Sequence, residues 1–286
     1  MALTTVTRTQ PANAALKDGR IRPQGVELEH VEVDPLIKAF RQMVREHAYA
    51  VTEMAFTTYL VAKEHGARFT AVPAFLLRGF HHGAVVAREQ GDPKELEGGR
   101  VGVNRGYTVT TGVWARGVLA DEHGVDLDSI TWVLSGDEHV AEYRPPANVV
   151  SAEGRDLGEL LAAGELDAAI GIAGFPPLIA DAEEAGFRAL RNRGHYPINH
   201  LVVLRDDELE HAPAVYDAFL RARDAYVRDG ELTPTHARVA EITGGDPLPY
   251  GVEPNRAVID ELVDHALRQK ILRKRPDVDA LFAVRG

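Results

Sequence analysis

The stretch 71–87 reads AVPAFLLRGFHHGAVVA, and it places an arginine and two adjacent histidines between two apolar runs. The runs on either side are short and rich in branched and aromatic residues, which predicts buried strands. In an open α/β sheet, ligands bind where strands end. Arg78 beside His81 and His82 therefore suits a small anionic ligand with a proton donor close by. An internal salt bridge for Arg78, with backbone partners for the histidines, stays open as a structural alternative.

Outward from this stretch, short strands alternate with helices, which predicts an α/β fold. The expected strands are Leu3–Thr7, Val26–Val31, Tyr49–Thr52, Phe69–Leu77, Phe80–Arg88, Val101–Val103, Ile130–Leu134, Ala168–Ile172 and Ile198–Leu204. The expected helices are Pro35–Glu46, Ala55–His65, Thr110–His123, Leu157–Ala163, Pro177–Ala185, Asp206–Arg228, Thr235–Thr243 and Asn255–Leu272. A Gly- and Pro-rich connector at 90–99 separates two α/β sections, and the chain re-enters strand pattern near residue 197. We therefore expect two lobes, 1–92 plus 197–286 and 93–196, with a ligand cleft between them.

Composition narrows the class of partner. The 286 residues are 45% hydrophobic and carry a formal net charge of −11, which disfavours nucleic acid. The chain has no cysteine, so thiolate catalysis and cysteine-bound zinc are excluded. No apolar run is long enough to span a membrane, and the first twenty residues lack the pattern of a secretory signal. We expect a cytoplasmic protein that binds a small anion, and the sequence leaves a homo-oligomer open.

Three further segments carry candidate site residues. Glu53 stands where a strand runs into a helix and is either a functional carboxylate or a partner of that helix's amino end. In VGVNRGYTVTTGVWARG (101–117) four hydroxyl-bearing side chains cluster where a helix opens, which favours binding of a carboxylate or phosphate over simple capping. These four residues are Tyr107, Thr108, Thr110 and Thr111. His200 and Asn199 stand at the start of the strand after the second lobe, where a structural role for the histidine is the alternative.

The sequence contains no pattern that demands a cofactor. There is no HExxH, GxSxG or P-loop motif. His81, His82, Glu53 and His200 can in principle form a divalent metal site, although nothing in their spacing requires one. We therefore expect no metal and no organic cofactor, with a divalent cation left open.

Several segments together resemble the 4,5-dihydroxyphthalate decarboxylase family, whose enzymes are built on the two-lobed fold of type 2 periplasmic binding proteins. The more specific segments are RGFHH (78–82), YTVTTGVWARG (107–117), YPINH (196–200) and PYGVEPNR (249–256). At Pro11, Ala12 and Asn13 the chain departs from the Asp-Arg-Thr-like stretch that family members carry before their first Asp-Gly turn. The exact substrate is therefore left open.

The resemblance implies a carboxy-lyase that converts a dihydroxylated aromatic dicarboxylate such as 4,5-dihydroxyphthalate into protocatechuate and CO2. Under this hypothesis Arg78 and the helix start Thr108–Thr111 anchor the carboxylates, and Tyr107 and Asn199 also bind the substrate. His82 or His81 donates a proton to carbon, and Glu53 with His200 handles the hydroxyl end. Two alternatives remain: a non-catalytic binding protein for a small aromatic or carboxylate ligand, and another lyase on this fold, similar to chorismate dehydratase.

Overall fold

The computed structural model describes residues 2–229 and 232–286, and the chain divides into two compact units. Unit 1 comprises Met1–Arg78, Ile198–Asp260 and Pro276–Gly286, and unit 2 comprises Gly79–Pro197 and Glu261–Arg275. The sequence had assigned residues 79–92 and 261–275 to the first lobe. In the structure they pack with unit 2, because β5 joins its sheet and residues 261–275 bond to its helices.

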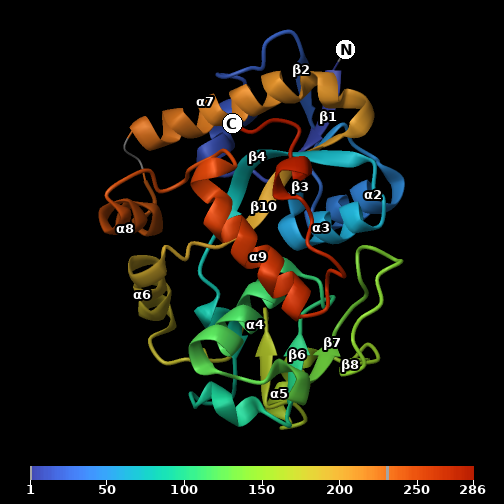
Figure 1. Ribbon diagram of the computed structural model, residues 1–286, viewed down its shortest axis with the longest axis vertical. Coiled ribbons are helices and arrows are strands. Elements are labelled where there is room, and N and C mark those ends of the chain that lie inside the picture. Colours follow the sequence, from blue (N-terminus) through green and yellow to red (C-terminus); the bar gives the residue numbers. More distant parts are fainter. Residues whose placement is uncertain (1, 230–231) are drawn as a thin grey trace. The chain divides into compact units, whose positions relative to one another are not determined.

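Unit 1 is a five-stranded sheet with the strand order β2-β1-β3-β10-β4. Its strands are β1 (Ala2–Val6), β2 (Glu27–His30), β3 (Val51–Ala55), β4 (Phe69–Arg78) and β10 (Ile198–Arg205). Its helices are α1 (Ala14–Lys17), α2 (Ile37–Glu46), α3 (Phe56–Glu64), α7 (Ala212–Arg228) and α8 (Pro234–Thr243). The strands β1, β2 and β3 are parallel, whereas β10 runs antiparallel to both β3 and β4 and lies between them (Figure 1).

The sequence pattern explains how unit 1 forms its core. Every residue of β3 is buried, and so are the first seven residues of α3, whose apolar side chains surround the helix. The helix α2 instead buries one stripe that contains Ala39, Phe40 and Met43, as its helical periodicity predicts. The strand β3 passes directly into α3 between Ala55 and Phe56, so Glu53 lies inside the strand rather than in the turn where the sequence predicts it.

Unit 2 is a second five-stranded sheet with the order β5-β9-β6-β7-β8. Its strands are β5 (Val85–Val86), β6 (Arg100–Val103), β7 (Thr131–Leu134), β8 (Val149–Ser151) and β9 (Ala168–Ile170). Its helices are α4 (Thr110–His123), α5 (Leu157–Ala162) and α6 (Ala182–Arg193), and α9 (Arg256–Arg268) begins in unit 1 and ends in unit 2. All neighbours in this sheet are parallel except β5, which pairs antiparallel with β9.

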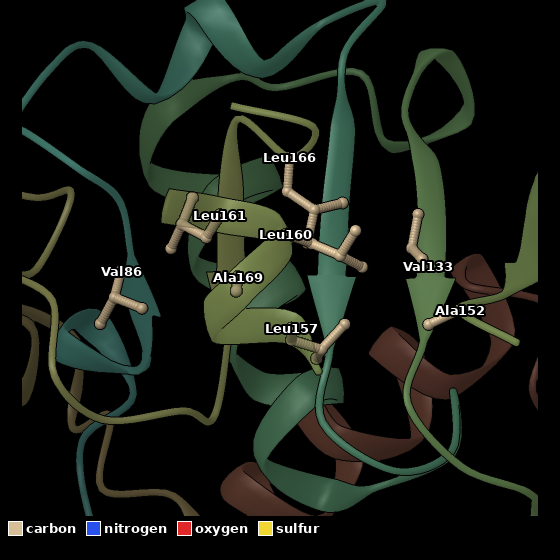
Figure 2. Close-up of a cluster of buried hydrophobic side chains, with 8 residues drawn as sticks. All are labelled: Val86, Val133, Ala152, Leu157, Leu160, Leu161, Leu166 and Ala169. Atoms are coloured by element: carbon tan, nitrogen blue, oxygen red, sulfur yellow. The ribbon is translucent and has the colours of Figure 1, made fainter. Parts of the chain in front are cut away.

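Leucines of α5 close one face of this second sheet. Figure 2 shows Leu157, Leu160 and Leu161 clustered with Val133 of β7 and Ala169 of β9. The i, i+3, i+4 spacing of the three leucines puts them on one side of the helix, so the short helix buries that side against the strands.

The structure departs from the expected elements most clearly at three places. The expected strand Phe80–Arg88 shrinks to β5, because a 3-10 turn at His82–Ala84 interrupts it. The expected helix Pro177–Ala185 begins only at Ala182, after Pro177 pairs with β5. The edge strand β8 was missed because it is only three residues long and partly exposed. Of the helices in the described part of the chain, none combines the length and apolar composition needed to cross a lipid bilayer.

Candidate functional site

In unit 1, the ends of several strands meet at one edge of the sheet, which we call the carboxyl edge of unit 1. Val6 at the end of β1 lies beside Thr52 of β3, and His200 near the start of β10 pairs with Ala55. On the other side of β10, Ile198 pairs with Arg78 at the end of β4. Since ligands of open α/β sheets bind at carboxyl ends, this edge is a candidate site.

The carboxyl edge of unit 1 holds a buried carboxylate and a histidine in direct contact. Glu53 is fully buried, and its Oε1 lies 2.6 Å from Nδ1 of His200, while Oε2 accepts the Arg8 N–H at 2.8 Å. Val202 pairs with Glu53 across the strands, and His200 lies two residues from Val202 on the same face of the sheet. The edge of the His200 ring also packs on Phe40, with centroids 5.1 Å apart.

This pair has the geometry of an acid–base dyad. A carboxylate that accepts a hydrogen bond from one ring nitrogen fixes the tautomer and orientation of an imidazole. The second nitrogen can then exchange a proton with a ligand. His200 keeps 14% of its side chain exposed, whereas Glu53 has no exposed surface, so the histidine is the member that a ligand can reach.

The loop that follows β1 contains the predicted departure at 11–13. Pro11–Asn13 forms a 3-10 turn, and the buried Asn13 accepts the Gln10 N–H and donates its side-chain amide to the Arg8 carbonyl. Asn13 therefore holds the segment whose Arg8 N–H bonds to Glu53.

Arg78 and Asn199 lie at the same edge as the Glu53–His200 pair. The Arg78 guanidinium donates to the Pro249 carbonyl at 3.1 Å and to the side-chain oxygen of Asn255. Asn255 donates its amide to the carbonyls of Pro249 and Gly251. The turn that the sequence marked as PYGVEPNR is thus tied to Arg78, and Asn199 is a largely buried neighbour of His200 in β10.

In unit 2, the predicted anion-binding segment Tyr107–Thr111 binds a carboxylate of the chain itself, that of Glu138. Tyr107 N–H donates to Glu138 Oε1 at 2.5 Å, and Oε2 of Glu138 accepts the Thr108 N–H at 3.2 Å and the Thr108 hydroxyl at 2.5 Å. The residue at the amino cap of α4 is Val109, so Thr110 and Thr111 start the helix and none of the four hydroxyl residues is its cap.

Glu138 is the site residue that the sequence reasoning missed. It lies in the loop that follows β7, a parallel strand adjacent to β6. An acidic residue just after the expected strand Ile130–Leu134 was the available signal, because parallel strands bring their carboxyl ends to one edge.

Arg116 lies beneath this segment. It is fully buried, donates to the Tyr107 carbonyl at 2.6 Å and to Gln269 at 2.8 Å, and holds its guanidinium carbon 4.0 Å from the Tyr107 ring centroid. Burial lowers the pKa of Arg116, while the nearby charge of Glu138 favours its charged form. A positive charge therefore lies under the residues that bind Glu138.

The histidines of the RGFHH motif lie in unit 2, in two different surroundings. His81 stacks near Trp114, with ring centroids 6.4 Å apart. His82 is fully buried, and its Nε2 lies 3.0 Å from Glu122. Its Nδ1 has no hydrogen-bond partner among the described residues.

Glu122 belongs to a group of five charged or titratable side chains that we call the unit 2 network. The Arg193 guanidinium lies 2.6 Å from the Glu122 carboxylate and 2.6 Å from that of Glu261. Nδ1 of His195 lies 3.0 Å from Glu261. Its members are His82, Glu122, Arg193, His195 and Glu261. Burial alone raises the pKa of Glu122, but hydrogen bonds from His82 and Arg193 outweigh it and lower the pKa to about 2. Burial raises the pKa of Glu261 as well, but hydrogen bonds from His195 and its other neighbours outweigh burial and lower this pKa. Burial lowers the pKa of His195.

The structure thus joins the predicted residues in separate groups. Glu53, His200, Asn199 and Arg78 share the carboxyl edge of unit 1, whereas Tyr107, Thr108, Thr110 and Thr111 surround the start of α4 and His81 and His82 lie near Trp114 and Glu122. Within residues 2–229 and 232–286, no three His, Asp or Glu side chains are grouped so as to hold a metal ion.

Solved structures with the same arrangement define the fold class. The alkanesulfonate-binding protein SsuA from Xanthomonas axonopodis pv. citri, bound to MOPS, matches with a TM-score of 0.53 at 17% identity, covering 98% of this chain and 97% of that chain. A protein from Archaeoglobus fulgidus matches with a TM-score of 0.57 at 14% identity, covering 95% and 98%. The desulfurization enzyme DszB matches at 0.52 and 15% identity, covering 98% and 96%. The chain has the type 2 periplasmic-binding-protein-like fold that the sequence predicts.

Sequence comparison narrows this class. A 4,5-dihydroxyphthalate decarboxylase from Comamonas testosteroni is 29% identical over 88% of this chain and 87% of its own length. A protein of the same name from Pseudomonas putida is 33% identical over 54% of this chain and 64% of its own length. No protein-family model matches the chain. The chain is thus similar in sequence to 4,5-dihydroxyphthalate decarboxylases of two organisms, in agreement with the resemblance seen in its motifs.

Proposed function

We propose that this chain is a carboxy-lyase that removes one carboxylate from a dihydroxylated aromatic dicarboxylate such as 4,5-dihydroxyphthalate, with protocatechuate and CO2 as products. The observation that carries the proposal is the contact of 2.6 Å between the buried Glu53 and His200. The names of the two decarboxylase relatives support the same reaction class.

The chemistry needs a base, an acid and anion binding. Direct loss of CO2 leaves a carbanion on the ring, so protonation of that carbon must come first. His200, oriented by Glu53, takes the proton of the hydroxyl para to the carbon and pushes electron density into the ring. The carbon then accepts a proton, and the keto intermediate loses CO2 as the C–C bonding pair returns to the ring and restores its aromaticity. The ring oxygen, which becomes negative in this step, takes its proton back from His200.

His82 remains our proposed proton donor to carbon, with His81 as the alternative. His82 is also paired with a carboxylate, Glu122, through Nε2. Its Nδ1, which has no partner in the described part of the chain, is the atom that would deliver the proton. The Glu122 carboxylate orients this imidazole, as Glu53 orients His200.

The substrate carboxylates need cationic or N–H partners. We assign this binding to Arg78, Asn199 and the segment Tyr107–Thr111. Arg78 offers planar donors that match a carboxylate, and the backbone N–H groups of Tyr107 and Thr108 bind one already, that of Glu138.

The second candidate function is a non-catalytic binding protein for a small aromatic or carboxylate ligand. The fold likeness to SsuA favours it, since that protein is an alkanesulfonate-binding protein. The Glu53–His200 pair favours the enzyme, because binding an anion does not require a buried carboxylate beside an imidazole.

The deciding experiment incubates the purified chain with 4,5-dihydroxyphthalate and measures CO2 and protocatechuate, with and without EDTA because the sequence leaves a divalent cation open. We expect equal amounts of both products and at least about 100-fold less of either with His200→Asn. Tight binding without product identifies a binding protein. Turnover of a different acid, with none of this one, identifies another lyase, such as one similar to chorismate dehydratase.

Location and assembly stay predictions of the sequence. Fractionation of cells that produce the chain tests the expected cytoplasmic location. Size-exclusion chromatography with light scattering tests for a homo-oligomer.

A further inference from the structure

Glu138 occupies a small set of donors in unit 2 that we call the anion cradle: the backbone N–H groups of Tyr107 and Thr108 and the Thr108 hydroxyl. Both carboxylate oxygens take part, one on Tyr107 and the other on Thr108. Two successive N–H groups and a hydroxyl around one carboxylate form the kind of arrangement in which proteins bind anionic ligands.

Glu138 does not serve as an ordinary helix cap. The amino cap of α4 is Val109, and the donors that Glu138 engages come from the two residues before it. The N–H groups that a helix leaves without intrahelical partners begin after its cap. The cradle is therefore built by the loop ahead of the helix, separately from the demands of helix capping.

Two neighbours shape the cradle for a negative charge. A Cβ atom on Gly106 would lie 2.5 Å from Oε2 of Glu138, so only glycine leaves room for a carboxylate there. Arg116 is fully buried under Tyr107, and its Nη1, beside Gly112 in the first turn of α4, has no hydrogen-bond partner among the described residues. A buried guanidinium favours an anion in the cradle whatever its source.

We infer that Glu138 is an internal stand-in for a ligand carboxylate: it fills the anion cradle in the free protein and must leave before a carboxylate of the substrate can bind there. This inference rests on the proposed function for the identity of the ligand as an aromatic dicarboxylate. The occupied cradle lowers apparent affinity, because only the open fraction of molecules binds.

The test is a binding measurement with phthalate, an aromatic dicarboxylate without the hydroxyl groups that the proposed reaction needs. Isothermal titration calorimetry compares the wild type with Glu138→Asp, Glu138→Gln and Glu138→Ala. If Glu138 fills the cradle about nine times in ten, each variant should lower the apparent Kd by about tenfold. Glu138→Asp is the decisive variant, since it keeps the charge and only draws the carboxylate back from the donors.

Matched variants separate occupancy from other effects. Glu142→Ala removes an exposed charge from the same loop and should leave the apparent Kd unchanged. Gly106→Ala should weaken phthalate binding in the Glu138→Asp background, because the added methyl group fills the position of the carboxylate oxygen. Circular dichroism and urea unfolding establish that each variant is folded.

Three results would overturn the inference: unchanged or weaker phthalate binding in Glu138→Asp, unchanged binding when Gly106→Ala is added, or no phthalate binding in any variant. Failure of the proposed function has a different signature, namely absence of CO2 from 4,5-dihydroxyphthalate. A chain that binds phthalate more tightly without Glu138, yet releases no CO2, keeps the inference and loses the reaction.

Discussion

His200 is the side chain on which the proposed reaction depends most, because its Nδ1 is fixed by a carboxylate that has no exposed surface. His200→Asn can keep the hydrogen bond to Glu53 but cannot carry a proton. We expect kcat to fall by at least about 100-fold, with phthalate affinity changed by less than about threefold.

The control is His65→Asn, which changes a histidine of the same unit just after α3. It should retain wild-type turnover. Near-normal turnover in His200→Asn would remove the dyad from the mechanism, whereas equal losses in both variants would indicate a general effect on folding.

Glu122 gives a prediction about acid stability. Its pKa falls from 4.5 to about 2 in the folded chain, so the carboxylate stabilises unit 2 above pH 4.5, and this contribution disappears as the pH falls from 4.5 towards 2. The shift corresponds to about 3 kcal/mol. Glu122→Gln should therefore unfold at lower urea concentration than the wild type at pH 6, and the difference should shrink at pH 3.5.

Urea unfolding at both pH values, followed by circular dichroism, measures this difference. The exposed Glu142→Gln serves as the control and should match the wild type at both. A difference for Glu122→Gln that stays constant with pH would show that its ionisation does not stabilise the fold.

Among helices and strands, α4 shows what periodicity alone can establish. The sequence predicts it at Thr110–His123, as observed, because apolar residues recur from Val113 to Ala120. The helix ends at Gly124, which adopts the left-handed conformation with φ of 65°. The expected helix Pro177–Ala185 begins only at Ala182, because Pro177 pairs with β5 and residues 178–181 form bends and a turn.

The packing of α4 against α9 depends on one glycine. A Cβ atom on Gly117 would lie 2.5 Å from two ring atoms of His265, which is itself buried. Gly117→Ala should lower the free energy of unfolding by about 1–3 kcal/mol, despite the better helix propensity of alanine. Urea unfolding measures this loss.

Gly245→Ala is the matched control, because nothing lies within 4 Å of the added Cβ atom. We expect a change within about 0.5 kcal/mol. If Gly117→Ala were as stable as this control, the contact between α4 and α9 would not depend on a glycine at this position.

For the chain as a whole, the fold class followed from alternating strands and helices together with family motifs, whereas much of the site did not. Periodicity identifies which residues are buried, but it does not say which loop carboxylate meets which N–H group. Glu138 with Thr108, and Glu122 with His82, are joined only by tertiary structure across some 30 to 40 positions. The sequence analysis gave Glu53 and His200 a common role, and the register of β3 and β10 explains why their side chains are in contact.

The anion cradle of unit 2 gives a prediction about substrate binding. Thr108→Val removes a hydroxyl of the anion cradle in unit 2, and we expect kcat/KM for 4,5-dihydroxyphthalate to fall by about tenfold, mainly through KM. His200→Asn in unit 1 should act mainly through kcat. Steady-state kinetics of both variants tests this division, and an unchanged KM in a folded Thr108→Val protein would contradict a binding role for unit 2.

The path of the chain through the two units bears on how the protein can be made. Unit 1 uses three separate segments of the chain and unit 2 uses two, and the last segment of unit 2, Glu261–Arg275, supplies Gln269 to Arg116. A ribosome must therefore have added nearly every amino acid before either half can be completed. No single proteolytic cut, and no gene split at one position, yields two intact halves.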